Sequence, residues 1–351
     1  MPTTYAIPNG RTVMDATTYT GNAGTNVIIN QAGFKPDLVW IKLRSGSASH
    51  LLTDSVRGVT AEVGTNRSDA EQTVSNALTS FNTNGFSLGN QSFSVYYGSM
   101  NDSGSTYVGW QWQAGQGSNT TNTTGTITST VSANATAGFS IVSFTMPNAS
   151  APQTVGHGLG AVPSFIVMKY RSQGSQWYCY HTSLGNGAEI HMNSTAALNS
   201  SSTFWNSTTP TSSVFTLGSA FVPDTSTSTM IAYCWAPVAG FSQFGSYTGN
   251  GSTDGPFIYL GFRPAYVMVK RTDSTGNWIV LDTTRSAYNY LTNDLLPNTP
   301  DAEQSPTTAW GWDMLSNGFK LRDNGTNDND NGWTYIYAAF AENPFKYANA
   351  R

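Results

Sequence analysis

The chain has few charged side chains: Asp, Glu, Lys and Arg make up 10% of its 351 residues, against about a quarter in an ordinary globular protein. The 16 Lys and Arg residues and the 20 Asp and Glu residues leave a formal net charge of −4. The chain therefore has no basic field that could neutralise phosphate groups, which argues against nucleic acid and anionic membranes as partners. A polar, nearly uncharged surface suits neutral partners such as glycans or other protein subunits.

Cysteine is also scarce, with only Cys179 and Cys234 in the chain. Two cysteines cannot form a disulfide framework for a chain of this length, and their separation matches no zinc or redox motif, so we expect two free core thiols. No apolar run approaches the roughly 18 residues of a membrane span, and the N-terminus lacks the basic and apolar regions of a secretory signal. These absences predict no membrane insertion and synthesis in a cytoplasm.

Aromatic residues and turn formers are abundant. Phe, Trp and Tyr make up 13% of the chain, and 34 Gly and 15 Pro residues supply turns. Aromatic and β-branched side chains fit the pleated, half-buried surface of a sheet, whereas Gly and Pro interrupt helices. The composition predicts an all-β fold.

One phrase occurs three times, at residues 36–42, 163–169 and 264–270. Each copy begins with proline, continues with apolar and aromatic residues, and ends with lysine six positions later. All four residues 38–41 are apolar, which indicates a strand buried on both faces, beneath a loop or against a neighbouring unit. Self-similarity of this kind is typical of a repeat architecture.

An alternating aromatic strand closes each repeat, at residues 107–112, 230–235 and 335–340. The distance from the proline to the last aromatic residue is 76, 72 and 76 residues. In the first copy, alternation places Val108, Trp110 and Trp112 on one face, which is the better core candidate.

The repeats predict three tandem units, at residues 1–117, 118–239 and 240–351. The first boundary lies in a low-complexity stretch rich in Thr, Asn and Gly, and the second is tight. Each unit has several short strands separated by turn signals, the pattern of a β-sandwich of jelly-roll or lectin-like type.

The phrases at residues 33–42 and 49–58, together with the closing phrase at 340–347, resemble a repeat domain of virion proteins of marine tailed phages. The resemblance extends over all three units. It implies a structural, tail-fibre-like protein that is made in the host cytoplasm and works in the virion, with other virion proteins as partners. Phage appendages commonly assemble as homo-oligomers, so a homotrimer is the first assembly to consider.

Asp54 and Arg57 are three residues apart after an apolar strand, and Asp282 and Arg285 repeat the pair. The pairs could form a polar pocket for sugar hydroxyls. The alternative is an Asp-capped turn whose arginine pairs with the aspartate. The second unit has a different phrase at this place, residues 180–183, so any role of the pair is not shared by all three units.

Catalytic and metal motifs are weak. His50, His181 and His191 show no metalloprotease or nucleophile-elbow spacing, and no acidic residue stands out as a buried acid, so we expect no enzyme activity. The loop at 323–332 contains oxygen ligands of the kind that calcium prefers, with Asp323, Asp328 and Asp330 as candidates. The same composition is ordinary for a hairpin turn, so calcium is the one cofactor that the sequence leaves open.

Exposed aromatic rings could stack on sugars. Tyr96 and Tyr97 are candidate glycan contacts, as are Tyr288 and Tyr290, although such rings more often belong to a core or a subunit interface. The first expectation for the function is a tail-fibre or appendage component that contacts host glycan. The alternatives are a capsid-decorating or cement protein and, least favoured, a polysaccharide depolymerase.

Overall fold

The computed structural model describes residues 4–90, 98, 100–223, 227–304, 311–325 and 327–344. Strands dominate this part of the chain, and its only helices are the 3-10 turns η1 (Gly10–Thr12) and η2 (Ser219–Phe221). The predicted all-β fold is confirmed. Neither described helix is long or apolar enough to cross a bilayer.

The described strands fall into three consecutive groups along the chain, each with a larger antiparallel sheet and a small one. The first group has a four-stranded sheet in the order β1-β9-β3-β4, a three-stranded sheet in the order β2-β8-β7, and the pair β5-β6. Its strands are β1 (Met14–Thr20), β2 (Asn26–Ile29), β3 (Leu38–Leu43), β4 (Leu51–Asp54), β5 (Ala61–Glu62), β6 (Gln72–Thr73), β7 (Leu78–Asn82), β8 (Gly85–Leu88) and β9 (Thr106–Trp112).

The second group is the most extended. Its large sheet has eight strands in the order β10-β11-β12-β19-β14-β15-β16-β17, and its small sheet pairs β13 with β18. Its strands are β10 (Thr120–Asn122), β11 (Ser129–Asn134), β12 (Phe139–Met146), β13 (Gln153–Gly156), β14 (Phe165–Tyr170), β15 (Tyr178–His181), β16 (Ala188–His191), β17 (Asn199–Ser200), β18 (Val214–Leu217) and β19 (Ser228–Trp235).

The third group repeats the plan of the first, with sheets in the order β20-β26-β22-β23 and β21-β25-β24. Its strands are β20 (Ser242–Thr248), β21 (Phe257–Tyr259), β22 (Phe262–Arg271), β23 (Trp278–Asp282), β24 (Trp312–Leu315), β25 (Gly318–Leu321) and β26 (Thr334–Pro344). The predicted boundaries at 117/118 and 239/240 fall between β9 and β10 and between β19 and β20.

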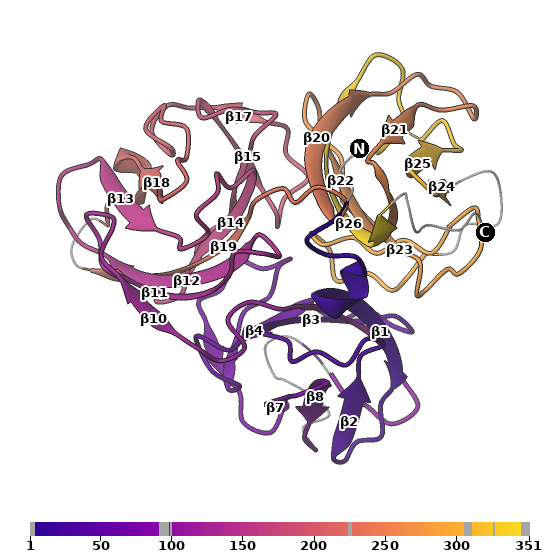
Figure 1. Cartoon of the computed structure of the whole chain (residues 1–351), viewed down its shortest axis with the longest axis horizontal. Coiled ribbons are helices and arrows are strands. Elements are labelled where there is room, and N and C mark those ends of the chain that lie inside the picture. Colours follow the sequence, from indigo (N-terminus) through magenta and orange to yellow (C-terminus); the bar gives the residue numbers. More distant parts are fainter. Residues whose placement is uncertain are drawn as a thin grey trace.

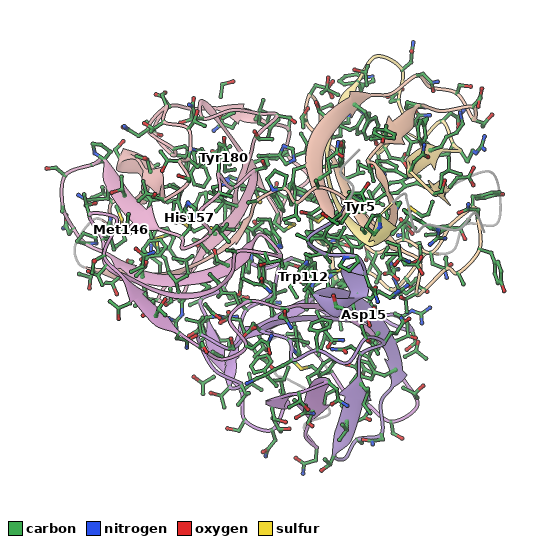
Figure 2. All side chains as sticks on the ribbon, in the orientation of Figure 1. Tyr5, Asp15, Trp112, Met146, His157 and Tyr180 are labelled. Atoms are coloured by element: carbon green, nitrogen blue, oxygen red, sulfur yellow. The ribbon has the colours of Figure 1, made fainter. Side chains whose placement is uncertain are left out.

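The three groups lie around a common centre, with the large sheet of each group on the inner side (Figure 1). This differs from a linear stack of units along a fibre. Trp112, the last residue of β9, lies where the groups meet (Figure 2). The reason is visible in the strands: each large sheet is apolar on both faces, so its second face needs a cover that the other groups provide.

The central strand of the first group makes this division plain. Val39 and Ile41 belong to the core inside the first group, whereas Leu38 and Trp40 belong to a core cluster that includes residues of all three groups. Burial on both faces is therefore confirmed, and of the two expected covers, a loop or a neighbouring unit, the structure shows the neighbouring groups. Val108, Trp110 and Trp112 also enter the shared cluster, and each fully buried large apolar side chain contributes roughly 1.5–3 kcal/mol.

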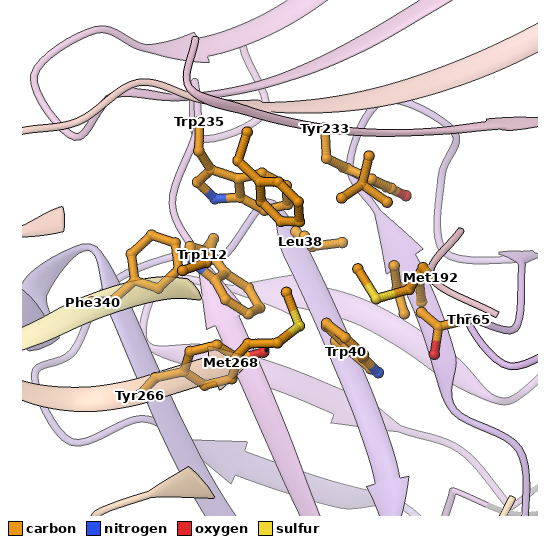
Figure 3. A pocket seen from close by; sticks show the side chains of 14 residues that line it. Leu38, Trp40, Thr65, Trp112, Met192, Tyr233, Trp235, Tyr266, Met268 and Phe340 are labelled. Carbon is orange, nitrogen blue, oxygen red and sulfur yellow. Dashed lines mark hydrogen bonds between the residues drawn. The ribbon is translucent and has the colours of Figure 1, made fainter. Parts of the chain in front are cut away.

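Equivalent residues of the three groups meet at the centre. Each large sheet contributes a cross-strand pair there: Leu38 opposite Trp112, Phe165 opposite Trp235, and Tyr266 opposite Phe340. They enclose an apolar cavity of about 20 Å³, shown with its lining in Figure 3. A cavity of this size holds at most about one water molecule, and an apolar lining gives that water no partner, so the centre is a packed core.

Candidate functional site

The lysine that ends each repeated phrase lies at a contact between groups. Each ammonium group donates a hydrogen bond to a loop carbonyl of another group: Lys42 to Pro300, Lys169 to Ser68 and Lys270 to Thr195, at 3.2, 3.2 and 3.3 Å. Burial lowers the pKa of all three lysines to about 8. The contacts run in one direction around the centre, from first to third, second to first and third to second group, so they close a ring.

A ring nitrogen eight residues after each lysine makes a second cyclic contact. Trp177 Nε1 donates to the carbonyl of Gly64 at 2.7 Å, and Trp278 Nε1 donates to the carbonyl of His191 at 2.9 Å. In the first group His50 takes this place, with Nε2 at 3.0 Å from the carbonyl oxygen of Leu296.

The surroundings of His50 fix its protonation state. Trp40 Nε1 donates to His50 Nδ1 at 2.9 Å, so the proton of the neutral ring is on Nε2, facing the Leu296 carbonyl. Complete burial keeps the pKa of His50 well below 6.5. The imidazole has both nitrogens engaged and is a structural group here.

Asp54 and Arg57 form a buried ion pair at the interface of the first and second groups. Both side chains have 0% exposure. Asp54 accepts a hydrogen bond from the Tyr233 hydroxyl at 2.8 Å, and Arg57 Nη1 contacts Glu71 at 3.0 Å. Glu71 in turn pairs with Arg171 of the second group at 2.8 Å. The four charged groups and the tyrosine thus connect two groups of strands.

Asp282 and Arg285 repeat this arrangement at the interface of the third and first groups, again with 0% exposed side chains. Trp110 Nε1 donates to Asp282 at 2.9 Å, and Arg285 pairs with Glu303 at 2.9 Å. Glu303 pairs with Arg44 of the first group at 2.8 Å. Burial alone would raise the pKa of Asp282, but the Arg285 guanidinium holds it below its ordinary value.

A sugar cannot reach either pair in this structure, because both aspartates and both arginines are covered by the neighbouring group. The geometry therefore favours the second interpretation of these residues, a capped turn with a paired arginine. In both turns the aspartate accepts from the backbone N–H of the arginine, at 2.9 Å.

The interface of the second and third groups has no such network among the described residues. His181 occupies the register position of the two aspartates, opposite Phe165 as Asp54 is opposite Leu38, and Leu184 follows three residues later. His181 Nε2 is 3.1 Å from the carbonyl oxygen of Tyr337, and burial lowers its pKa to about 4. The residue across the interface explains why an aspartate is absent here. Ala338 stands where the other interfaces have Trp110 and Tyr233, and alanine has no side-chain donor.

An acidic residue also recurs beside each interface. These acids are Glu62, Glu189 and Asp294, and each is followed by an apolar residue that occupies the same place in its group. The three apolar residues pair with equivalent strand positions: Val63 with Leu52, Ile190 with Cys179, and Leu295 with Val280. Burial raises the pKa of Glu62 to about 8 and that of Asp294 to about 7. Neither carboxylate oxygen of Glu62 has a hydrogen-bond partner among the described residues, so this acid is held mainly neutral at pH 7.

Two aspartates of the acidic loop in the third group, Asp323 and Asp328, are buried. Asp323 accepts from the backbone N–H of Gly311 and Gly325, and Asp328 accepts from Trp312 Nε1 at 2.6 Å. Burial raises the pKa of Asp323 and, with the neighbouring Asp323 charge, raises that of Asp328 well above its ordinary value. Both carboxylates thus accept hydrogen bonds from donors of the third group itself.

Asp330 lies apart from this pair, with its side chain 34% exposed and Arg271 at 3.5 Å. Among the described residues, no three His, Cys, Asp or Glu side chains gather as metal ligands would. The neighbouring Asn329 donates to the carbonyls of Ser252 and Asp323, as Asn101 does to those of Gly24 and Gly89 in the first group. The loop thus has the geometry of a turn that the first and third groups share.

The candidate aromatic contacts separate into two cases. Tyr96 and Tyr97 lie outside the described residues. Tyr288 and Tyr290 are 81% and 46% exposed, and Tyr290 lines an open groove of about 430 Å³ together with Thr253, Asn289, Asp313 and Arg322.

Both predicted free thiols are confirmed, since Cys179 and Cys234 are buried and unbridged. No pattern in the sequence indicated the interface role of several charged residues, among them Glu71, Glu303, Arg44 and Arg171. A signal for part of the ring was present, because His50, Trp177 and Trp278 each follow the repeated lysine by eight residues.

Comparison with known families gives one match. Residues 10–344 match the family described as a domain of unknown function, DUF7483. The match runs as one span from η1 to the end of β26 and so includes all three groups of strands. No curated protein and no solved structure matches the chain. The chain belongs to the DUF7483 family.

Proposed function

We propose that this chain is a non-enzymatic structural protein of a tailed-phage particle, made in the host cytoplasm and assembled with other virion proteins as a compact block on the capsid surface. The virion setting comes from the resemblance of the repeated phrases to marine phage virion proteins. Decoration or cementing of the capsid takes precedence over a fibre role because of one observation, the closure of the three groups around a common core (Figure 1).

Ring closure argues against a shaft for a physical reason. Units of a fibre present their ends to one another and extend along an axis, as stacked repeats do. Here the lysines, ring nitrogens and ion pairs of each group are engaged by its neighbours around the centre, in contacts such as Lys42 to Pro300 and Lys169 to Ser68. The same engagement supports a non-enzymatic role, because the buried titratable groups beside the interfaces serve packing.

Localisation in the particle tests this function. Purified virions are analysed by mass spectrometry, and the chain is then located in a cryo-EM reconstruction. We expect it on the capsid lattice in many copies. Density at a tail tip would instead support the appendage function, and absence of the chain from purified particles would contradict a virion role altogether.

Contact with a host-surface glycan is a second candidate, and the groove at Tyr290 favours it. Arg285 and Asp294 are nine residues apart, whereas Arg57 and Glu62 are five apart, so the third group has a longer connection that carries Tyr288 and Tyr290. Exposed rings beside polar side chains suit the C–H faces and hydroxyls of a sugar.

Binding to polysaccharide extracted from the host surface tests the groove. Tyr290→Ala should abolish this binding, whereas Val162→Ala, which shortens a similarly exposed apolar side chain outside the groove, should leave it unchanged. Equal binding by both variants would contradict the candidate.

A further inference from the structure

Exposed apolar side chains concentrate on two strands, β2 and β21. Val27 and Ile29 are 56% and 58% exposed, and Phe257 and Tyr259 are 43% and 54% exposed. The residues between them, Ile28 and Ile258, are buried, as strand alternation requires. Each strand is the outer member of its small sheet, in the orders β2-β8-β7 and β21-β25-β24. Both therefore combine a sheet edge with an apolar outer face.

The two strands occupy the same place in their groups, and β13 is their counterpart in the second group. Ile28, Val155 and Ile258 each pair with an aromatic residue of the neighbouring strand, namely Phe86, Phe215 and Phe319. By this register, Thr154 corresponds to Val27 and Phe257, and Gly156 corresponds to Ile29 and Tyr259. The second group thus has small or polar residues where the other two expose apolar ones.

The edge of β13 is already occupied by another segment of the chain. Ile127 forms a parallel bridge with Val155, and its N–H donates to the Thr154 carbonyl at 3.0 Å. The Thr154 N–H donates to Thr126 Oγ1 at 2.8 Å. Ile127 itself is buried in the core of the second group. The outer edge of this small sheet can therefore accept an extended segment, as it does here with residues 126–127 of the same chain.

In the first and third groups no described segment forms backbone pairs with the outer edge of β2 or β21, and the one contact there is a long hydrogen bond of 3.5 Å from Gln243 Nε2 to the Tyr259 carbonyl. Proteins usually protect a free edge with charged residues, proline or a bulge, because its unpaired backbone groups attract other strands. The sequences of β2, Asn-Val-Ile-Ile, and of β21, Phe-Ile-Tyr, contain no charge and no proline. Their exposed side chains would also lie about 5 Å from those of an added strand, close enough to pack.

We propose that β2 and β21 are the surfaces through which copies of this chain associate, by pairing of edge strands. A second copy fits as the occupant because each molecule offers two such edges, and each edge supplies an uncharged, apolar strand for the other. The low charge of the chain, 10% of its residues, leaves little repulsion between copies. The threefold arrangement lies within one chain, so these contacts join whole molecules to one another.

Sedimentation velocity of the purified full chain tests the proposal with charged variants of each edge. The variants are Val27→Lys/Ile29→Lys, Phe257→Lys/Tyr259→Lys, and the combination of all four substitutions. Thr130→Lys/Thr145→Lys is the control, since it places two lysines at exposed positions of the inner strands β11 and β12. Circular dichroism and thermal unfolding establish that each variant is folded.

We expect the wild-type chain and the control to form assemblies that grow with concentration, and the fourfold variant to be a monomer. If each edge pairs with its own kind, each double variant stops at a dimer. If β2 pairs with β21, each double variant is a monomer, and an equimolar mixture of the two forms a dimer. A monomeric wild type, or a folded fourfold variant that assembles like the wild type, would overturn the proposal. None of these outcomes depends on where the chain lies in a particle.

Discussion

Two of the three interfaces between strand groups contain a buried aspartate–arginine pair, and the described residues of the third interface do not. The interface of the first and second groups has Asp54 and Arg57, and that of the third and first has Asp282 and Arg285. The interface of the second and third groups has His181 in the equivalent position and Leu184 in place of the arginine. The same backbone arrangement therefore tolerates either a charged network or a mostly apolar contact.

The side chain opposite each position explains the difference. A buried aspartate needs a donor from the neighbouring group, and Tyr233 and Trp110 supply one. Ala338 supplies none, and the neutral His181 ring instead bonds the backbone oxygen of Tyr337. Buried polar residues thus vary together with their partners across an interface, and both members must change for the contact to remain satisfied.

The largest effect is expected from Arg57→Leu. This substitution leaves Asp54 as a buried, uncompensated charge, which costs roughly 3–5 kcal/mol of unfolding free energy. The double variant Asp54→His/Arg57→Leu introduces the residue types found at 181 and 184, leaves no uncompensated carboxylate at position 54, and should be more stable than the single variant. Chemical denaturation measures both, and a double variant as unstable as Arg57→Leu would contradict this account of the interfaces.

Burial lowers the pKa of both His50 and His181, so acid should weaken both of the interfaces that contain them, and the variant proposed here is of His181. The pKa of His181 is about 4 in the folded chain and 6.5 in the unfolded chain, so its contribution is present above pH 6.5 and is lost as the pH falls towards 4. The full difference corresponds to about 3 kcal/mol. His181→Gln keeps a donor for Tyr337 and should flatten the dependence of unfolding free energy on pH between 6.5 and 4. An unchanged slope would show that other groups control it.

The contribution of Glu62 to the free energy of unfolding should change with pH in the direction opposite to that of His181. The pKa of Glu62 is about 8 in the folded chain against 4.5 in the unfolded chain, so stability is greatest below pH 4.5 and falls as the pH rises through 8. Glu62→Gln removes the ionisation and should stabilise the chain by up to roughly 1.4 kcal/mol for each pH unit above 4.5 in this range. Thermal unfolding at pH 4.5 and pH 7.5 measures the difference. Equal gains at both pH values would contradict a buried acid with a raised pKa.

The smallest effect is expected from Tyr233→Phe. It removes one hydroxyl that donates to Asp54 and lies 3.1 Å from Arg57, at a cost of about 2 kcal/mol for a hydrogen bond to a charged group. The ion pair remains, so the loss should be smaller than that of Arg57→Leu. Chemical denaturation of the two variants under the same conditions checks the order, and a larger loss for Tyr233→Phe would reverse the assigned roles of the two side chains.

Local patterns predicted much of the fold. The repeated proline-to-lysine phrase marks β3, β14 and β22, and the aromatic phrase marks β9, β19 and β26, because strand propensity and alternation depend on neighbouring residues. The pairing of Asp54 with Arg57 was also within reach, since three residues across a turn bring both side chains together. The burial of residues 38–41 on both faces was readable from their unbroken apolar character.

The partners across the interfaces could not be predicted in this way. Tyr233 is 179 residues from Asp54, and Trp110 is 172 residues from Asp282, so only the placement of whole sheets brings them together. The acidic loop shows the same limit, because its composition fits a calcium site and a turn equally well. Burial beside Trp312 gives Asp328 a raised pKa, and nothing in the loop sequence contains that information.

The sequence by itself determined that this chain is all-β, carries three copies of one strand pattern, and has few charged residues with a formal net charge of −4. The tertiary structure alone decided that the copies close into a ring and that the repeated lysines and the aspartate and arginine pairs become interface contacts. It also decided that the edge of β13 is paired, whereas no described segment pairs with the outer edges of β2 and β21. The physical reason is range: hydrophobic alternation and turn chemistry act between neighbours in the chain, whereas burial, charge pairing and edge exposure depend on residues that only folding brings together.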